Sequence, residues 1–272
     1  MVPDVAGSSP VDRPILCKDF MNWLHALILG FVQGCTEFLP ISSSAHLKIL
    51  KTKLHIVGDS VFFDLACHLG TLVALCFYFR KDLRNICLSQ PKKMIPYCIA
   101  LLPLIPAYFL LKPVRDFASN PLFLGPLLFV TSIFLFLSRK KLSGAVQNPT
   151  VKDALWIGAL QSMALIPGIS RSASTITAAL FRGLSVKEAV RFSFLLSIPA
   201  VLGGTFLEFI KLLKGSPSST DMGASAIGFM TSAAVGFIAI RKAIPLLEKG
   251  CFKPFAWYCL IVAILLTMGL IW

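Results

Sequence analysis

Long apolar blocks separated by short polar segments make up most of the chain after residue 20. They run approximately over 23–41, 61–79, 94–111, 121–138, 154–167, 173–181, 190–210, 223–240 and 255–272. A helix needs about 20 mainly apolar residues to cross the hydrocarbon core of a bilayer. We therefore predict an all-α polytopic membrane protein with about six transmembrane helices, at 61–79, 94–111, 121–138, 190–210, 223–240 and 255–272.

The charges between the blocks predict which ends of the helices face the cytoplasm. Lys and Arg gather in segments 80–93, 139–152 and 241–253, whereas 112–120 holds only Lys112 and Arg115. Cytoplasmic loops carry an excess of these residues. We therefore place the first three segments inside and the fourth outside, and alternation of the helices then places 211–222 outside as well.

Two stretches do not fit as simple crossings and are predicted to form re-entrant helical hairpins. The neighbouring crossings require both ends of 154–182 to lie inside and both ends of 23–54 to lie outside. Residues 166–174, IPGISRSAS, interrupt one stretch, and Pro40 interrupts the other. Proline and glycine break helices, and the remaining pieces are too short to span a bilayer.

The two breaks resemble each other, which predicts an inverted-topology repeat. Residues 40–45 read PISSSA and residues 167–173 read PGISRSA, and a glutamine precedes each proline, at Gln33 and Gln161. In such repeats the broken helices meet near the midplane and form the polar site. The predicted organisation is a tail at 1–20 and one membrane domain at 21–272, with repeats at 21–150 and 151–272.

Composition agrees with a membrane protein and excludes several other classes. Of the 272 residues, 56% are hydrophobic and only 14% are charged, whereas soluble domains are about one quarter charged. A soluble enzyme, a disordered chain and a nucleic-acid-binding module are therefore excluded. The net charge of +13 is explained by the excess of Lys and Arg in the predicted cytoplasmic loops, and contact with anionic headgroups or an anionic substrate could add to it. The eight cysteines contain no Cys-x-x-Cys pair, so neither a disulfide framework nor a zinc site is expected.

The first break gathers most of the candidate chemistry, in Gln33, Glu37, Ser42, Ser43, Ser44 and His46. Gln33 and Glu37 are four residues apart and share one face of a helix. A carboxylate at a helix centre in a membrane costs roughly 2.5–3.5 kcal/mol. Glu37 therefore indicates a function, either paired with an imidazole or holding a divalent cation, beside a hydroxyl nucleophile. The alternative is a glutamate that caps a helix near the interface.

Arg171 marks the second break as a phosphate site. It lies between Ser170 and Ser172 and shortly before Thr175, at the predicted start of a helix. A guanidinium fork with hydroxyls and free backbone N–H groups suits phosphate oxygens. The alternatives are an arginine that reaches the cytoplasmic headgroups or a structural ion pair with Glu37.

The sequence leaves the roles of five other polar residues open. Asp64 and His68 are four residues apart in an apolar block and could line the site, assist proton transfer or reach the membrane surface. Lys48, Lys51 and Lys53 lie on the predicted outer face, against the charge rule, and could meet headgroups or substrate.

Both breaks resemble a known family of membrane phosphatases. Residues 33–46, QGCTEFLPISSSAH, and 167–175, PGISRSAST, resemble the two signatures of the bacitracin-resistance type (BacA/UppP) undecaprenyl-diphosphate phosphatase family. The likeness runs in order from about residue 21 to the C-terminus. It implies six crossings plus two re-entrant hairpins in the bacterial inner membrane. It also implies hydrolysis of undecaprenyl diphosphate to undecaprenyl phosphate and phosphate, which recycles the carrier for peptidoglycan synthesis and confers bacitracin resistance.

The resemblance further implies roles for single residues. Catalysis falls to Glu37, Ser43, His46 and Arg171, with Ser43 as the nucleophile. Substrate binding or support of the site falls to Gln33, Ser42, Ser170, Ser172 and Thr175. A divalent cation, Mg²⁺ or Ca²⁺, is expected on Glu37 and Gln33. Gln33 replaces a frequent Glu of the family, and its amide can ligate a metal but cannot act as a base.

Several alternatives remain open from the residues alone. Ser43, His46 or an activated water could attack phosphorus, with His46 or Glu37 as the base. A transporter or flippase of a phosphorylated polyprenyl lipid would also use inverted repeats and broken helices. The active site is expected to open to the outer side, because the first hairpin enters from there. Oligomeric state and lipid chain length leave no signal in the sequence.

Overall fold

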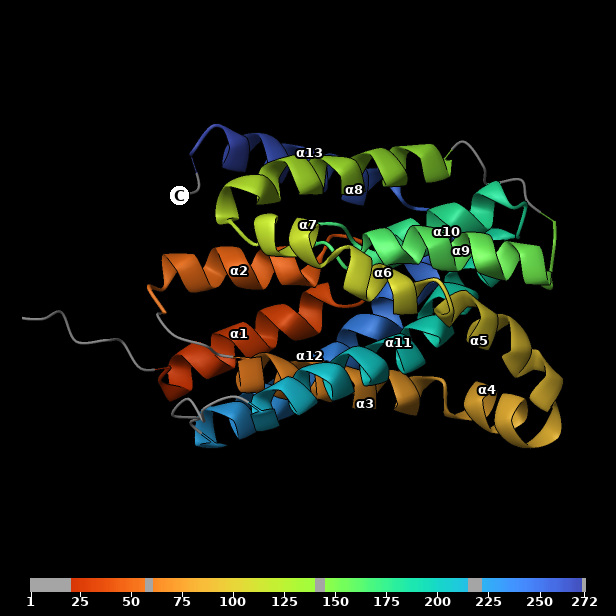
Figure 1. The fold of residues 1–272 in the computed structure, drawn as a ribbon, viewed down its shortest axis with the longest axis horizontal. Coiled ribbons are helices and arrows are strands. Elements are labelled where there is room, and N and C mark those ends of the chain that lie inside the picture. The colour runs from red at the N-terminus through yellow and green to blue at the C-terminus, as the bar shows by residue number, and fades with distance from the viewer. Residues whose placement is uncertain (1–20, 57–60, 140–144, 215–221, 271–272) are drawn as a thin grey trace, which may run out of the picture.

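The computed structural model describes residues 21–56, 61–139, 145–214 and 222–270 as a bundle of helices along one long axis (Figure 1). Within these residues there is no strand, and the one isolated β-bridge joins Val146 to Leu184. The predicted all-α polytopic class is confirmed. The predicted tail at 1–20 lies outside the described residues.

Taken in chain order, the helices form two series, divided at the predicted repeat boundary. The first holds α1 (Trp23–Thr36), α2 (Ser43–Lys53), α3 (Val61–Tyr78), α4 (Arg80–Arg84), α5 (Ile95–Leu101), α6 (Leu104–Leu110), α7 (Lys112–Phe117) and α8 (Leu124–Arg139). A short π-helix, η1 (Asn85–Ser89), and two short 3-10 helices, η2 (Pro91–Met94) and η3 (Pro121–Phe123), lie between them. The second holds α9 (Val151–Met163), α10 (Arg171–Phe181), α11 (Val186–Lys214), α12 (Met222–Glu248) and α13 (Lys253–Thr267). Each series thus begins with two short helices, and the division into two repeats stays a prediction.

Five helical stretches are long and apolar enough to cross a membrane. They are Val61–Tyr78, Pro91–Leu110, Pro121–Ser138, Val186–Lys211 and Met222–Glu248. These correspond to five of the six predicted crossings. The sixth, predicted at 255–272, contains α13, an apolar helix of 15 residues. Pro103 and Pro106 divide the second stretch into α5 and α6, because proline cannot donate the backbone hydrogen bond that would continue a helix.

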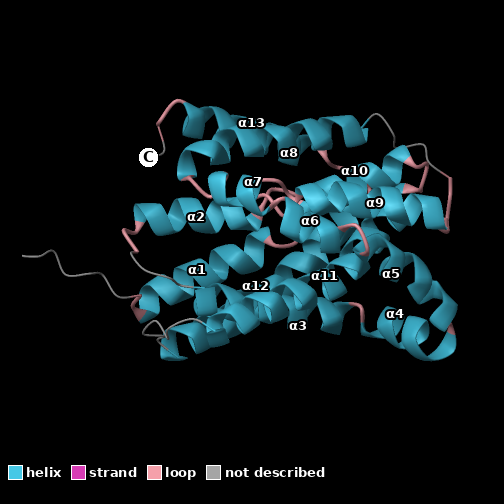
Figure 2. Cartoon of the chain, in the orientation of Figure 1, coloured by secondary structure: helices cyan, strands magenta, loops and turns pink. Residues whose placement is uncertain are grey.

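Each of the two stretches that were predicted to form a re-entrant hairpin contains an antiparallel pair of helices. α1 packs with α2, and α9 packs with α10. In Figure 1 the first pair opens toward the left of the molecule and the second toward the right. Their connecting loops meet in the middle (Figure 2). The opposite directions support re-entry from opposite membrane faces, which stays a prediction.

Small residues bring the first hairpin close to α12. A side chain at Gly34 would lie 2.8 Å from Cβ of Val235, and one at Gly30 would lie 2.9 Å from the Gly228 carbonyl oxygen. Small residues at the interfaces of membrane helices let the backbones approach closely. This close packing holds the turn after α1 near the centre of the bundle, beside the long helices that line the site.

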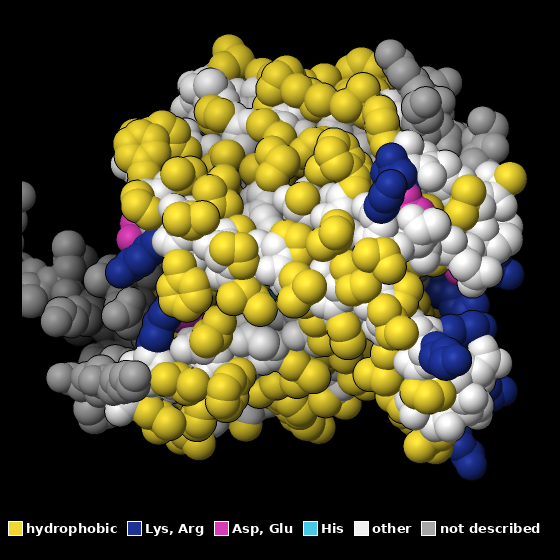
Figure 3. Space-filling view, turned by 45° about the vertical axis from the view of Figure 1, so that its right-hand side comes forward, with side chains coloured by type: hydrophobic (Ala, Val, Ile, Leu, Met, Phe, Trp, Pro, Cys, Tyr) yellow, Lys and Arg dark blue, Asp and Glu magenta, His cyan; other side chains and the backbone are white. Residues whose placement is uncertain are grey.

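The outer surface of the bundle suits lipid. Apolar side chains cover most of the face in Figure 3, and Lys and Arg gather toward its ends. Phe109 and Leu110 are 68% and 76% exposed, and Leu122 is 68% exposed. Large apolar groups tolerate such exposure where hydrocarbon surrounds them.

Candidate active site at the meeting point of the two hairpins

Unusual backbone conformations shape the two hairpin turns. Ser42, just before α2, has φ of 67° and lies in the left-handed region, which is uncommon outside glycine. Gly168 has φ of 103°, and a side chain there would lie 2.6 Å from Cβ of Leu127. Ser170 caps α10 by accepting a hydrogen bond from the Ala173 amide, so Arg171 is the first residue of that helix.

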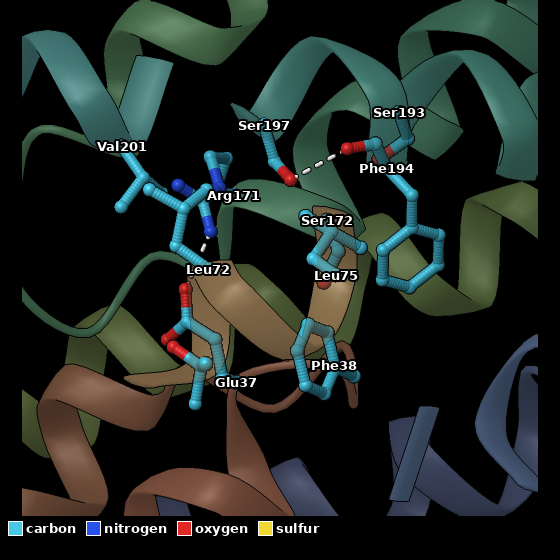
Figure 4. Close-up of a pocket in the computed structure, with 11 residues that line it drawn as sticks. Glu37, Phe38, Leu72, Leu75, Arg171, Ser172, Ser193, Phe194, Ser197 and Val201 are labelled. Carbon is cyan, nitrogen blue, oxygen red and sulfur yellow. Dashed lines mark hydrogen bonds and ion pairs between the residues drawn. The ribbon is translucent and has the colours of Figure 1, made fainter. Parts of the chain in front are cut away.

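Glu37 is the centre of the site and joins the two hairpins. Its Oε1 accepts a hydrogen bond of 2.6 Å from Nη2 of Arg171 (Figure 4). Its Oε2 accepts one of 2.6 Å from the Ser43 hydroxyl and one of 3.0 Å from Nε2 of Gln33. The Glu37 side chain is only 7% exposed. A buried carboxylate requires such partners, because unpaired charge in a medium of low dielectric is very costly.

Arg171 keeps donors available for a ligand. Its pairing with Glu37 uses Nη2, and no partner of Nε or Nη1 is found among the described residues. The Thr175 hydroxyl holds the backbone of Arg171, because it donates a hydrogen bond of 2.8 Å to the Arg171 carbonyl. The same hydroxyl lies 2.6 Å from the Ser193 hydroxyl. Thr175 therefore positions Arg171, whose remaining N–H groups can bind phosphate oxygens.

The imidazole beside Glu37 belongs to His68 of α3. Nδ1 of His68 lies 2.8 Å from Nε2 of Gln33 and 3.7 Å from Oε2 of Glu37. The sequence left the role of His68 open, and the structure places it in the cluster. Asp64, one turn earlier, pairs with Lys51 at 2.5 Å. Lys48 bonds the Ser119 carbonyl, so two of the three lysines on the predicted outer face have local partners.

His46 lies on the other side of the first turn. Its Nδ1 is 2.8 Å from the Ser42 carbonyl oxygen, and its Nε2 is 2.8 Å from the hydroxyl of Tyr258 in α13. The two rings stack with centroids 5.6 Å apart. Both nitrogens are therefore engaged away from Ser43. Sequence reasoning did not find Tyr258, because 212 residues separate it from His46 and no local pattern links them.

A cavity of about 200 Å³ opens beside the cluster. It is lined by polar residues from both turns, namely Glu37, Ser42, Ser43, Ser44, Ser170, Arg171 and Ser172, and by His68 of α3. Within each turn two hydroxyls pair, Ser42 with Ser44 and Ser170 with Ser172, both at 3.2 Å. The structure thus brings most of the predicted site residues to one cavity.

Three predicted residues do not line the cavity. Gln33, His46 and Thr175 instead form hydrogen bonds with the Glu37 carboxylate, the Ser42 carbonyl and the Arg171 carbonyl, respectively. A second, smaller space, which Glu37 and Arg171 also line, has room for about one water (Figure 4). The predicted roles of single residues in substrate binding stay predictions.

Comparison with known proteins identifies the family. The family described as "Bacitracin resistance protein BacA" matches residues 26–265. "Undecaprenyl-diphosphatase" of Protochlamydia amoebophila is 38% identical over 254 residues, which cover 91% of this chain and 98% of that protein. "Undecaprenyl-diphosphatase 3" of Bacillus cereus is 36% identical over 253 residues, 91% of this chain and 97% of that protein. "Undecaprenyl-diphosphatase" of Geotalea daltonii is 38% identical over 258 residues, which cover 88% of this chain and 94% of that protein. With nearly its whole length matched and both signatures meeting at one cavity, this chain belongs to the bacitracin resistance protein BacA family.

Proposed function

We propose that this chain hydrolyses undecaprenyl diphosphate to undecaprenyl phosphate and inorganic phosphate. One observation carries the proposal: Glu37, Ser43 and Arg171, from two hairpins far apart in the sequence, meet at one cavity. That set offers a base, a hydroxyl and a cation, which are the groups that phosphoryl transfer requires. The relatives named undecaprenyl-diphosphatase match nearly the full chain.

The proposed first step transfers the terminal phosphoryl group to Ser43. The Ser43 oxygen forms a bond to the terminal phosphorus, and its proton passes to Glu37, whose Oε2 lies 2.6 Å away. The bond from that phosphorus to the bridging oxygen breaks, and undecaprenyl phosphate leaves with the electron pair. Arg171 neutralises charge on the phosphoryl oxygens. Water then attacks the phosphoserine, releases phosphate and restores the hydroxyl.

Hydrogen bonding favours Glu37 over His46 as the base. A general base must lie within hydrogen-bond reach of the proton that it takes. Ser43 donates to Glu37, whereas both nitrogens of His46 bond the Ser42 carbonyl and Tyr258. In this scheme His46 holds the backbone of the turn that presents Ser43.

We also propose that Glu37 and Gln33 hold a divalent cation, Mg²⁺ or Ca²⁺. Among the described residues no three His, Cys, Asp or Glu side chains gather at one point. The Glu37 carboxylate and Oε1 of Gln33, which is buried and has no partner among the described residues, nevertheless offer two hard oxygen ligands. Mg²⁺ commonly takes one or two protein carboxylates and completes its shell with water and substrate phosphates. When bound, it would supply Lewis-acid stabilisation of phosphate charge.

The function is tested by phosphate release from purified protein in detergent with a C55 diphosphate as substrate. We expect release without any second compartment, which separates hydrolysis from transport. A chelator is expected to reduce the rate by roughly tenfold or more, because a bound cation stabilises transition-state charge by several kcal/mol. Mg²⁺ or Ca²⁺ should restore it. Absence of release by protein that is folded and supplied with cations would end the proposal.

We further place the chain in the bacterial inner membrane with the cavity open to the outer side. Ser44 is exposed and lines the cavity, so it provides a probe in a variant without native cysteines. A membrane-impermeant thiol reagent is expected to label Ser44→Cys in intact cells, and inorganic pyrophosphate should slow the reaction. Gln147→Cys, before α9 on the predicted inner side, is the control and should react only after permeabilisation. If the reagent labels Gln147→Cys but not Ser44→Cys in intact cells, the proposed orientation is reversed.

A further inference from the structure

We propose that Gln161, near the end of α9, binds the diphosphate group of the substrate through its side-chain amide. This inference rests on the proposed function and adds a substrate-binding residue from the second hairpin. The polar pattern of the sequence pointed to the equivalent residue of the first hairpin, Gln33, and gave Gln161 no role in the site.

The Gln161 amide is buried and has no hydrogen-bond partner in the part of the chain that the structure describes. The residue is only 2% exposed, and neither Nε2 nor Oε1 has a hydrogen-bond partner among the described residues. Gln161 also lines the cavity that contains Glu37, Ser43 and Arg171. Its side chain is therefore a buried polar group at the wall of the candidate site.

Several of the described residues that line the cavity with Gln161 are apolar and cannot bond its amide. Leu104, Ala164 and Leu165 line the cavity as well, with apolar groups. Gln33 differs, because its Nε2 donates to Glu37 and contacts His68. Two glutamines in similar positions of the two hairpins thus have different surroundings. Of the two, only Gln161 has neither amide atom hydrogen-bonded among the described residues.

A ligand or water in the cavity explains such an amide. A buried donor without a partner costs roughly 1–3 kcal/mol, so native proteins rarely keep one without a reason. The N–H groups of Gln161 can donate to phosphate oxygens, and its Oε1 can accept from a water. Arg171 and the hydroxyls of Ser43 and Ser172 reach the same cavity, so the diphosphate would be bound from both hairpins, with Gln161 as the contribution of α9.

Gln161→Leu tests the proposal, because leucine keeps the bulk of the side chain and removes its polar atoms. If Gln161 has only a structural role, Gln161→Leu should keep full activity. Its thermal stability should be equal or higher, because the substitution removes an unpaired buried polar group. If Gln161 binds the substrate, the leucine variant should again have equal or higher thermal stability, but it should bind the substrate more weakly. A hydrogen bond to a charged ligand contributes enough that we expect KM to rise about 10- to 100-fold, with kcat changed far less.

Inhibition by inorganic pyrophosphate gives a second readout that does not depend on turnover of the lipid. Its inhibition constant should rise by a similar factor in Gln161→Leu, and its direct binding should weaken equally. Gln147→Leu is the matched control, since Gln147 is exposed and lies away from the cavity. Gln161→Met serves if the leucine variant does not fold.

The outcomes separate this inference from the proposed function. Unchanged KM and unchanged pyrophosphate binding in a folded Gln161 variant would overturn the role of Gln161 while wild-type hydrolysis persists. If the wild type releases no phosphate, the proposed function fails. Pyrophosphate binding by the wild type and the variant then still decides whether Gln161 binds the diphosphate.

Discussion

Arg171→Ala is expected to reduce phosphate release at least about 100-fold while the protein still folds and inserts. Arg171 Nη2 lies 2.6 Å from Glu37, and its other nitrogens are available at the cavity wall. A diphosphate brings several negative charges into a site of low dielectric, and removing one charge-stabilising group from a transition state typically costs 10²–10³-fold in rate. Glu37→Gln should lose a similar factor, because it removes the proposed base.

The measurement is kcat in detergent, with thermal unfolding as the check on folding. Arg182→Ala is the matched control, because Arg182 follows the same helix and pairs with Asp153 at 2.6 Å, outside the cavity. Arg171→Lys should recover only part of the activity, since lysine keeps the charge but not the bidentate fork. If Arg171→Ala or Glu37→Gln keeps a kcat near that of the wild type, the site assignment is wrong.

Ser43→Ala is expected to lose roughly 10³-fold or more in kcat, because it removes the proposed nucleophile. Ser42→Ala and Ser44→Ala should lose much less. Their hydroxyls pair with each other at 3.2 Å, whereas the Ser43 hydroxyl donates to Glu37 at 2.6 Å. The comparison of three adjacent serines therefore separates attack from general support of the turn.

A rapid-quench experiment with labelled diphosphate identifies the attacking group directly. Label on Ser43 is the expected result, and Ser43→Cys is expected to keep a trace of activity. Label on His46, or full activity in Ser43→Ala, would instead make histidine or water the nucleophile. His46→Ala should then decide between the two, since it removes one candidate and leaves Ser43 paired with Glu37.

The sequence by itself determined the class of the protein, its long apolar helices and the location of the candidate site. Apolar length predicts the spanning helices, and proline and glycine predict the breaks, because both effects act within a few residues of the chain. Polar residues inside apolar blocks stand out since burying them is costly. Glu37 and Arg171 were identified in this way. The contact of Gln33 with Glu37 follows from their spacing of four residues on α1.

Only the tertiary structure decided which partner each of these residues meets. The pairing of Glu37 with Arg171 crosses 134 positions, and that of His46 with Tyr258 crosses 212. Local periodicity fixes contacts within one turn of a helix, whereas these pairs depend on how helices from both halves pack. The sequence offered His46 as the imidazole for Glu37, and packing placed α3, with its His68, there instead. Packing likewise left Gln161 buried at the cavity wall, because the apolar neighbours that α9 meets there cannot bond its amide.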